Sequence, residues 1–586
     1  MRIAFIPELS ESTSSPLANA AIKFLHNREF GKLTSLASKE AAAGNEIILV
    51  AHNIIQKELL QKYQGNVQGM PTYTKAEYEK LEKQATNIVN NFYKINSLKQ
   101  SMVIDGVDFS DCLRHAILDE VMILCKAAFS IRKITQNCDK IVVQNKNRFY
   151  GKVSASVCKS TSILFQSASV SSLSRIKEAA KSRIAKKKYF DSQMYVKNSY
   201  LWKLSKGKTR VLIDSRYVNS LRNINSAAKI LAESDFEVYV LSNYPSIDQI
   251  FAWAIPEEID LDFKEHSGYF GLSFDFSDLK TDGIFVYDAI DIFPILKDKL
   301  AYYFGSGMEK LLEDRFYFDQ VLERIKPSIH IVGDDRVHGG RCHVLASKLN
   351  GVKTVEIPHG IDGFEGGPIN SIASDVYLAG GKVVQDVMTR LGSDKRKVKI
   401  VGWPRYDEML KSYNKEGSEN YVLFAPDAVD THLNAALVEM IAANLKRKLV
   451  VKPHPGETAE VYDYLSKINN VDLRKKNEDI TPLLKGSDAV ISLASTTCVQ
   501  ALALGKPLVI INTTNRYNMT KLFSDMKVAV EISDLNDVKY MGKNIQKAEK
   551  LIRNKINYNK AVAYFCYKID GKSSERAAKE IIKLAS

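Results

Sequence analysis

The 586-residue sequence lacks the short motifs that would assign a chemistry at once. It contains no HExxH zinc motif, no GxxxxGKS/T phosphate loop and no sound GxGxxG dinucleotide fingerprint. Asp260-Leu261-Asp262 has the D-x-D form of some metal sites, but it lies in an acidic stretch rather than after a buried strand, so we interpret it as surface. We therefore predict chemistry that needs neither a metal ion nor a bound cofactor.

Long apolar runs and paired cysteines are also missing. No uninterrupted apolar run reaches the roughly 18 residues that a membrane-spanning helix needs. The opening MRIAFIPE is too short for a signal peptide, and we interpret it as a first strand. Seven cysteines are scattered without a CxxC pair, at Cys112, Cys125, Cys138, Cys158, Cys342, Cys498 and Cys566. This usage predicts reduced core thiols in a cytoplasmic protein rather than disulfides or a zinc site.

Positive charge exceeds negative charge, with 82 Lys and Arg against 68 Asp and Glu and a formal net charge of +14. The excess favours an anionic partner, such as a nucleotide-linked donor, an acidic glycan, a phospholipid surface or nucleic acid. Nucleic acid is disfavoured among these, because the basic residues are spread along the chain and no recognised nucleic-acid-binding motif accompanies them.

The most basic segment, Ser171 to Arg210, places Lys and Arg around a sparse apolar stripe. Two interpretations stay open. A basic amphipathic helix can lie on anionic lipid, which would give the protein a peripheral contact with the inner face of the cell membrane. A solvated helix between domains has the same composition, and the narrow stripe favours this second interpretation.

The rhythm of apolar segments divides the chain into four regions. In residues 1–205, strand-like pieces alternate with helical ones at 74–98 and 109–134, which indicates an α/β extension that ends in the basic helix. Strands with helices between them then recur every ~20 to 30 residues, in 206–402 and again in 403–560, which is the pattern of a doubly wound parallel sheet. Residues 561–586 are expected to form a closing helix.

The most informative stretch is 449–512, where two buried strands each run into a polar turn. His454 lies between two prolines at the end of the first strand, which is where open α/β sheets bind ligands. Ser495, Thr496 and Thr497 precede a helix-like segment, and hydroxyls at a helix start suit a phosphate. The alternatives are a rigid turn at His454 and a simple N-cap at Ser495.

Two Rossmann-like domains, the second with a KPHP turn, a Ser/Thr turn and a GKP segment before a strand, resemble the GT-B glycosyltransferases. The pairing of an HP motif with a Ser/Thr motif is similar to that of bacterial sialyltransferases, polysialyltransferases and capsule Kdo transferases. The segments VGDD, EIPHGIDG, DVYLAGG and VGWPRYD resemble capsule-polysaccharide and CDP-glycerol glycerophosphotransferase-like enzymes. The resemblance spans residues 326–586 and implies an α/β fold with two Rossmann-like domains facing a cleft.

In those families the HP histidine and the Ser/Thr turn hold the nucleotide phosphates of the donor. The resemblance implies the same role here, and a leaving nucleotide that gains negative charge would be stabilised by fixed hydrogen-bond donors. Glu457 is expected to bind a ribose or to cap the next helix, and Gly402 and Arg405 are expected to lie at the hinge. The predicted donor-binding residues are Lys452, His454, Glu457, Ser495, Thr496, Thr497, Pro426, Asp427, Gly402 and Arg405.

The acceptor hydroxyl needs a base, and sialyltransferases carry it on an acidic triplet that this chain does not share. The nearest candidates are Asp335 and Asp334 in the segment GDDR, with Thr281-Asp282-Gly283 a poor second. A paired carboxylate can raise the pKa of one partner toward that of a base. Asp334 has the alternative of capping the helix that follows. His359 is expected to point into the same crevice as base, phosphate ligand or turn former.

These features predict a glycosyltransferase of surface-polysaccharide or glycoconjugate biosynthesis. It would transfer a sugar from a nucleotide-sugar donor, a CMP-linked nonulosonic acid or Kdo, to a glycan or lipid-linked acceptor. A CDP-glycerol-type glycerophosphotransferase is the alternative enzyme. A non-catalytic nucleotide- or sugar-binding protein is the alternative from another class.

Overall fold

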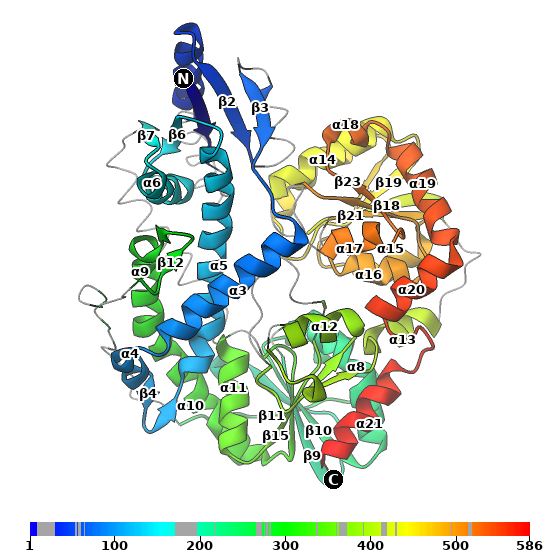
Figure 1. Cartoon of the computed structure of the whole chain (residues 1–586). Helices are drawn as coiled ribbons and strands as arrows, with labels where there is room; N and C mark the ends of the chain where they lie inside the picture. Colours follow the sequence, from blue (N-terminus) through cyan, green and yellow to red (C-terminus); the bar gives the residue numbers. More distant parts are fainter. Residues whose placement is uncertain are drawn as a thin grey trace.

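The computed structural model describes residues 1–8, 30–52, 65–169, 196–264, 283–358, 372–427 and 431–585, with gaps inside these ranges at 216, 336–337, 391, 412–418, 494 and 514–518 and a few single residues between them. These residues form three domains, each built on a mainly parallel sheet. In Figure 1 the N-terminal domain lies at the upper left, the middle domain at the bottom and the C-terminal domain at the right. The predicted α/β class with two Rossmann-like domains is confirmed by the second and third sheets. Most of the predicted basic helix lies outside the described residues.

The N-terminal domain has a five-stranded sheet in the order β3-β2-β1-β6-β7 with every pair parallel. Helix α6 packs on β6 and β7, α5 packs on α6, and α3 packs on α5. Helical spacing places Leu113, Ile117, Val121 and Leu124 on one face of α5, and all four are buried. The strands are β1 (Arg2–Ile6), β2 (Glu46–Ala51), β3 (Asn66–Gly69), β6 (Lys140–Asn145) and β7 (Leu164–Ser169). The other elements are α3 (Lys75–Phe92), α4 (Asn96–Ser101), β4 (Val103–Ile104), β5 (Val107–Asp108), α5 (Ser110–Thr135) and α6 (Phe149–Thr161).

The middle domain has an eight-stranded sheet in the order β11-β8-β10-β9-β14-β15-β16-β17, parallel except at the β8 and β11 edge. Its first strand, β8, begins at Tyr200, within the range predicted for the N-terminal region. The sheet strands are β8 (Tyr200–Lys203), β9 (Thr209–Asp214), β10 (Phe236–Ser242), β11 (Glu257–Ile259), β14 (Ile329–Val332), β15 (Lys353–Glu356), β16 (Val376–Ala379) and β17 (Val398–Ile400). The helices include α8 (Val218–Glu233), α10 (Met308–Ile325), α11 (His338–Leu349), α12 (Lys382–Arg390) and α13 (Pro404–Lys411). A small hairpin of β12 (Val286–Tyr287) and β13 (Ile290–Asp291), followed by α9 (Phe293–Tyr302), packs instead on α3, α5 and α6 of the N-terminal domain.

The C-terminal domain has a six-stranded parallel sheet in the order β20-β19-β18-β21-β22-β23. Each strand is a short run of buried apolar residues, as expected where helices cover both faces. The strands are β18 (Tyr421–Ala425), β19 (Lys448–Val451), β20 (Val471–Leu473), β21 (Ala489–Ser492), β22 (Leu508–Ile511) and β23 (Val530–Ile532). The helices are α14 (Thr431–Asn444), η5 (Ala459–Lys467), α15 (Ile480–Gly486), α16 (Thr497–Ala503), α17 (Met519–Asp525), α18 (Leu535–Val538), α19 (Met541–Arg553) and α20 (Lys555–Phe565).

The last helix, α21 (Ser573–Ala585), leaves the C-terminal domain and packs on α8 and α13 of the middle domain. Asp407 caps the start of α21, because its two carboxylate oxygens accept the backbone N–H groups of Ser573 at 3.0 Å and Ser574 at 2.7 Å. Gly402 makes room for the same approach. Its φ is +89°, and a Cβ atom there would lie 2.4 Å from the Ser573 hydroxyl oxygen. Gly402 therefore allows the chain crossing between the two domains.

Buried side-chain contacts join the three domains to one another. Arg341 of α11 is 2% exposed and pairs with Asp111 at the start of α5, which joins the middle domain to the N-terminal one. Trp403 donates its indole N–H to the Phe565 carbonyl at 2.9 Å and packs on Gly380, which joins the middle domain to the C-terminal one. The relative placement of the domains is thus held by buried contacts on both sides.

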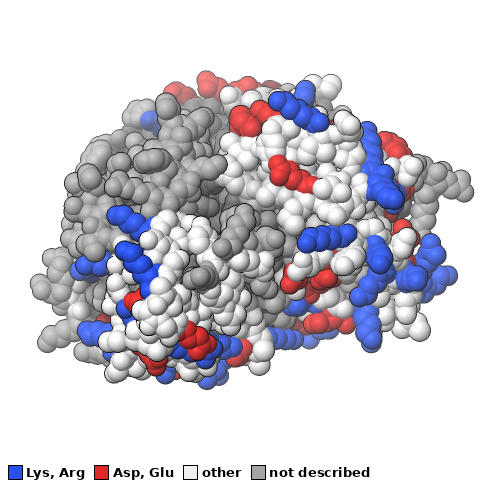
Figure 2. Space-filling model, turned by 90° about the horizontal axis from the view of Figure 1, so that it is seen from above, with Lys and Arg blue, Asp and Glu red and all other residues white. Residues whose placement is uncertain are grey.

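The described residues on one face of the molecule carry charges of both signs. On the face shown in Figure 2, Lys and Arg side chains are interleaved with Asp and Glu. Asp260 and Asp262 are exposed, as predicted for a surface loop. All seven cysteines are unpaired and buried, as predicted for core thiols. Over the part of the chain that the structure describes, no helix is both long and apolar enough to cross a bilayer.

Candidate functional site

Strand order identifies the ligand-binding edge of each sheet. In the C-terminal sheet the chain moves outward in one direction from β18 and in the other from β21, so the order reverses between these two neighbours. In the middle sheet the reversal lies between β9 and β14. Ligands of open α/β sheets bind outside the carboxyl ends of the strands at such a reversal. The predicted residues Pro426 and Asp427 follow β18, and the Ser/Thr turn follows β21, so both border the reversal of the C-terminal sheet.

His454 lies one strand away, in a rigid turn after β19. The backbone N–H of His454 donates to Glu457 Oε2 at 2.6 Å, and its imidazole Nδ1 accepts the Gly456 N–H at 3.1 Å. An imidazole that accepts at Nδ1 carries its proton on Nε2, where it is a hydrogen-bond donor. The ring is half-buried. The turn therefore fixes the imidazole at the edge of the sheet with its proton on Nε2.

Glu457 is buried within this turn. Its Oε1 accepts hydrogen bonds from Asn434 Nδ2 and the Tyr462 hydroxyl, each at 2.7 Å. Burial raises the pKa of Glu457, and these hydrogen bonds act in the opposite direction. At 3% exposure the carboxylate is enclosed by protein groups. This geometry assigns it to holding the turn and argues against the predicted ribose contact.

The Ser/Thr turn meets a turn of the middle domain. Ser495 Oγ accepts the Thr497 N–H at 3.3 Å and donates to Thr497 Oγ1 at 3.2 Å, so these two hydroxyls are ordered before α16. Thr496 packs against Gly360, which follows β15 in the segment PHG; a Cβ atom on Gly360 would lie 2.5 Å from Thr496 Cγ2. The carboxyl ends of the second and third sheets therefore touch across the domain interface.

Asn223, which the sequence analysis did not select, fixes the middle-domain side of this contact. It lies on α8 and is 2% exposed. Its Nδ2 donates to the Pro358 carbonyl at 2.6 Å, and its Oδ1 accepts the Arg405 N–H at 3.1 Å. One amide thus positions both the turn before His359 and the start of α13. A lone Asn on the buried face of a helix carries no sequence signal for this role.

The predicted residues Lys452 and Arg405 lie near each other across the interface. Burial, together with the positive charges of Arg222 and Arg405, lowers the pKa of Lys452 to about 8. Lys452 Nζ donates to the Lys476 carbonyl at 2.9 Å. Arg405 Nη2 lies 3.6 Å from Asp479 Oδ1, and burial lowers the pKa of Arg405. Two of the predicted donor-binding cations thus interact electrostatically, and Arg222, which the sequence analysis did not select, acts on both.

Asp335, the first predicted base, is placed differently from the prediction. Its side chain is fully buried, and Oδ2 accepts the backbone N–H groups of Ala373 at 3.0 Å and Ser374 at 2.7 Å. This carboxylate ties the end of β14 to the segment before β16, and no acceptor hydroxyl can reach it in this arrangement. Its neighbour Asp334 is half-buried at the reversal of the middle sheet. His359 and the segment Thr281-Asp282 lie outside the described residues.

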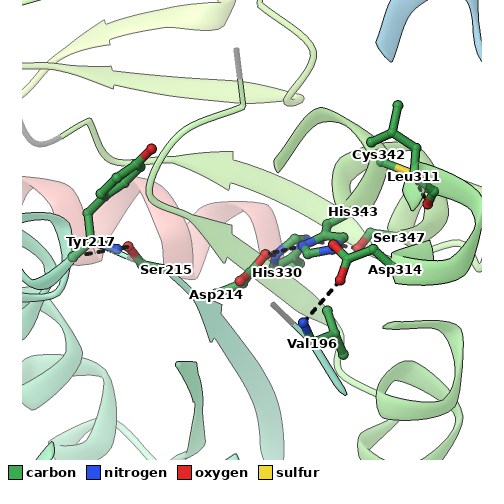
Figure 3. A network of polar contacts seen from close by, with 10 residues as sticks. All are labelled: Val196, Asp214, Ser215, Tyr217, Leu311, Asp314, His330, Cys342, His343 and Ser347. Carbon is green, nitrogen blue, oxygen red and sulfur yellow. Dashed lines mark hydrogen bonds and ion pairs between the residues drawn. The ribbon is translucent and has the colours of Figure 1, made fainter. Parts of the chain in front are cut away.

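A buried polar network lies behind the middle-domain end of the site (Figure 3). His343 of α11 contacts Asp214 Oδ2 through Nδ1 at 2.7 Å and Asp314 Oδ2 through Nε2 at 3.0 Å, and its ring stacks on Phe318 at 4.1 Å. Burial alone would lower the pKa of His343, but the two carboxylates raise it to about 9. The network joins β9, α10 and α11 and is closed to solvent, so its role is to position the strand ends.

Two surface hollows lie in other parts of the molecule. One of about 490 Å³ is lined by residues 31–39 and 166–168, and one of about 320 Å³ by residues 84–91 of α3 and 283–286. Neither touches the meeting point of the second and third sheets. Among the residues that the structure describes, no three His, Cys, Asp or Glu side chains are grouped so as to hold a metal ion.

Comparison with known proteins shows only distant likenesses. No protein-family model and no curated protein matches the chain. A UDP-GlcNAc 2-epimerase from Neisseria meningitidis bound to UDP-GlcNAc is 14% identical, covering 64% of this chain and 100% of its own, with a TM-score of 0.41. A glycosyltransferase from Rickettsia africae is 13% identical over 64% and 99%, with a TM-score of 0.40. The wall teichoic acid polymerase TagF is 13% identical over 46% and 75%, with a TM-score of 0.35. The fold assignment stands on the sheets described above.

Proposed function

We propose that the chain is a glycosyltransferase that binds a nucleotide-activated sugar between its middle and C-terminal domains. The observation that carries the proposal is the contact of Gly360 with Thr496, because it brings the ligand-binding edges of two doubly wound sheets to one interface. A donor held by one domain would then face groups of the other. This arrangement suits group transfer, in which a bound donor must be presented to a second substrate.

The residues at this interface suit departure of a nucleotide. The leaving phosphate gains negative charge as the sugar bond breaks, and preorganised donors stabilise that charge. His454 offers an N–H held in one tautomer, Ser495 and Thr497 offer ordered hydroxyls, and Lys452 and Arg405 offer positive charge. In the proposal, Asp334 is the described candidate for the base, because it is half-buried at the reversal of the opposite sheet.

The donor is proposed to be a CMP-linked nonulosonic acid or Kdo, and the acceptor a glycan or lipid-linked glycan of surface-polysaccharide or glycoconjugate synthesis. The order of motifs along the sequence supports this choice, and no cofactor besides the activated donor is needed. The enzyme would work in the cytoplasm, with a peripheral contact to the inner face of the membrane. A CDP-glycerol-type phosphotransferase is the competing enzyme, since its donor also loses CMP.

A nucleotide panel tests the site. We expect CMP or CDP, but not UDP, GDP or NAD, to raise the melting temperature, and His454→Ala to abolish the rise while the melting temperature without ligand stays near that of the parent. His454→Gln keeps a side-chain N–H donor and should retain part of the rise. No stabilisation of the parent by any nucleotide would contradict both enzyme assignments.

Donor turnover then separates the candidates. CMP release from CMP-N-acetylneuraminic acid or CMP-Kdo, but not from CDP-glycerol, would support the glycosyltransferase, and the reverse would support the phosphotransferase. Nucleotide binding without release from any donor, in the presence of mixed glycan acceptors, would favour the non-catalytic alternative. Asp334→Asn should lower turnover about 100-fold or more if Asp334 is the base.

A further inference from the structure

Helices α19 and α20 carry a face of basic residues along the outer side of the C-terminal domain, at the right of Figure 1. From Lys539 to Lys560 the chain has seven Lys and Arg residues and one acidic residue, Glu549. All seven basic residues are exposed. This basic face consists of Lys539, Lys543, Lys547, Lys550, Arg553, Lys555 and Lys560.

Helical spacing turns the basic residues of α19 away from the domain. Lys543, Lys547 and Lys550 recur after four and three positions, which places them on one side of the helix. The opposite side, with Ile545 and Ala548, is buried, and α19 packs on β22 and β23. The charges of α19 are therefore presented to solvent while its apolar side holds it on the sheet.

Acidic residues near the basic face do not pair with it. Glu549 within the face is half-buried, and Asp537 lies just before it. Asp386 of α12, Glu439 of α14 and Glu531 of β23 lie on elements that pack on α19 or α20. Asp386 and Glu531 each pair with a lysine outside the face. Among the residues that the structure describes, no member of the basic face forms an ion pair, so its charges repel one another without compensation.

Two large apolar side chains are exposed within the same face. Tyr540 is 55% exposed, and Lys543 Nζ lies 5.4 Å from the centre of its ring, which is a cation–π contact. Ile556, in the first turn of α20, is 79% exposed. The headgroup region of a bilayer takes up tyrosine and aliphatic side chains beside basic ones. A soluble polyanion would match the charges but would leave these apolar side chains in water.

Clusters of about four to eight Lys and Arg residues are attracted to the anionic lipids of a membrane surface. We propose that the basic face docks the C-terminal domain on an anionic lipid bilayer, with Ile556 entering the headgroup region. The proposed function supplies the need for such a contact, a lipid-linked acceptor, and in that respect the inference rests on it. The basic face itself is defined by the charge, exposure and packing of α19 and α20.

Cosedimentation of the full chain with vesicles tests the basic face. The probes are vesicles of phosphatidylcholine alone and of phosphatidylcholine with phosphatidylglycerol. The parent should bind the anionic vesicles about tenfold or more tightly than the neutral ones, and the binding should weaken as salt is added. A triple variant with Lys543→Gln, Lys547→Gln and Lys550→Gln should lose roughly 100-fold, since each basic residue near such a surface contributes about fivefold.

Matched variants separate this face from net charge and from exposed apolar residues in general. A second triple variant, with Lys75→Gln, Lys80→Gln and Lys83→Gln, also removes three exposed lysines from one helix, α3, and should stay within about twofold of the parent. Ile556→Ser should weaken vesicle binding several-fold, because it removes the apolar side chain that enters the headgroup region. Ile255→Ser changes an isoleucine of the middle domain that is 94% exposed and should have no effect. Melting temperatures without vesicles check that every variant folds.

Several outcomes would overturn the membrane contact: no binding of the parent to anionic vesicles, equal binding to both kinds of vesicle, or equal losses in the two triple variants. Binding of polyuridylate or hyaluronate that depends on Lys543, Lys547 and Lys550, without binding of vesicles, would assign the face to a soluble polyanion and overturn it as well.

The nucleotide panel separates this inference from the proposed function. Vesicle binding with the expected losses, but without stabilisation by any nucleotide, supports the basic face and overturns the donor assignment. Stabilisation by CMP or CDP without vesicle binding does the reverse.

Discussion

Gly360 of the middle domain lies against Thr496 of the C-terminal domain so closely that a Cβ atom on Gly360 would come within 2.5 Å of the threonine methyl group. That spacing is below any ordinary carbon–carbon contact, so the interface tolerates glycine here and no larger residue without movement. The contact joins the turn after β15 to the turn after β21. The closeness of the two sheets' ligand-binding edges therefore depends on one glycine.

Gly360→Ala should separate these turns. We expect a loss of roughly 1–3 kcal/mol of unfolding free energy from overpacking, together with weaker nucleotide binding. Thr496→Ser removes the obstructing methyl group and keeps the hydroxyl, so the double variant should recover most of both losses. Urea unfolding and nucleotide titration of the two single variants and the double variant provide the measurement. A double variant as impaired as Gly360→Ala alone would show that this contact does not set the domain spacing.

CMP binding should weaken as the pH rises past about 8, since the pKa of Lys452 is lowered to about 8 and its neutral form no longer attracts the phosphate. A bound anion favours the protonated form, so the loss should move to higher pH at saturating ligand. Lys452→Arg keeps its charge over the whole range. CMP titrations between pH about 7.5 and about 9.5 should fall for the parent and stay level for Lys452→Arg, because the CMP phosphate keeps its charge over this range. Equal slopes would exclude Lys452 as the titrating group.

His343 should make the free energy of unfolding decrease as the pH rises into the alkaline range. Its folded pKa is raised to about 9, above the unfolded value of about 6.5, so its contribution is complete below about pH 6.5 and is lost as the pH rises through about 9. His343→Gln should cost roughly 3–5 kcal/mol at pH 6, because it leaves buried carboxylates without a cation. The variant should also flatten the decline in unfolding free energy between pH 6.5 and 9.

His330 provides the matched control for that experiment. It is as buried as His343 and lies 3.5 Å from Asp214. Burial lowers the pKa of His330, so this residue makes the free energy of unfolding decrease toward acid pH instead. His330→Asn should therefore lower stability yet leave the alkaline decline in place. If both variants removed the alkaline decline, the titrating group would be the network as a whole rather than His343.

Asp407 should be needed for docking of the last helix. Asp407→Ala removes the acceptor for the Ser573 and Ser574 N–H groups, and loss of an N-cap costs about 1–2 kcal/mol. Limited proteolysis should then release a fragment that lacks α21. Asp394→Ala, which removes an N-cap from the surface turn η4 (Lys395–Lys397), serves as the control and should change stability by less than about 0.5 kcal/mol. Unchanged proteolysis of Asp407→Ala would contradict the assigned role.

The spacing of apolar residues along the sequence predicted helices and strands of this fold. The α5 face with Leu113 and Val121 follows from helical spacing, and the short apolar runs at 490–493 and 508–511 follow from the way parallel sheets bury both faces. The KPHP and Ser/Thr turns were located because prolines and hydroxyls at strand ends have a physical reason to be there. What this reasoning could not supply was which side chains of those turns are enclosed.

Asp335 and Glu457 illustrate that gap. Each is a carboxylate at a strand end, as a catalytic or ribose-binding residue would be, and each is used by neighbouring backbone and side-chain donors instead. A carboxylate beside unpaired N–H groups is drawn to them whatever the motif that surrounds it. Those N–H groups come from residues 38 or 39 positions along the chain in the case of Asp335, beyond the reach of any local pattern.

By itself, the amino-acid order determined where strands, helices and strand-end turns form, because these depend on spacing and backbone chemistry within a few residues. Only the tertiary structure decided that the charges of Arg222 and Arg405 act on Lys452, and that Asn223 holds two segments of the middle domain in place. The physical reason is distance along the chain. Arg222 and Lys452 belong to different domains, and their charges interact only after both domains have folded and docked.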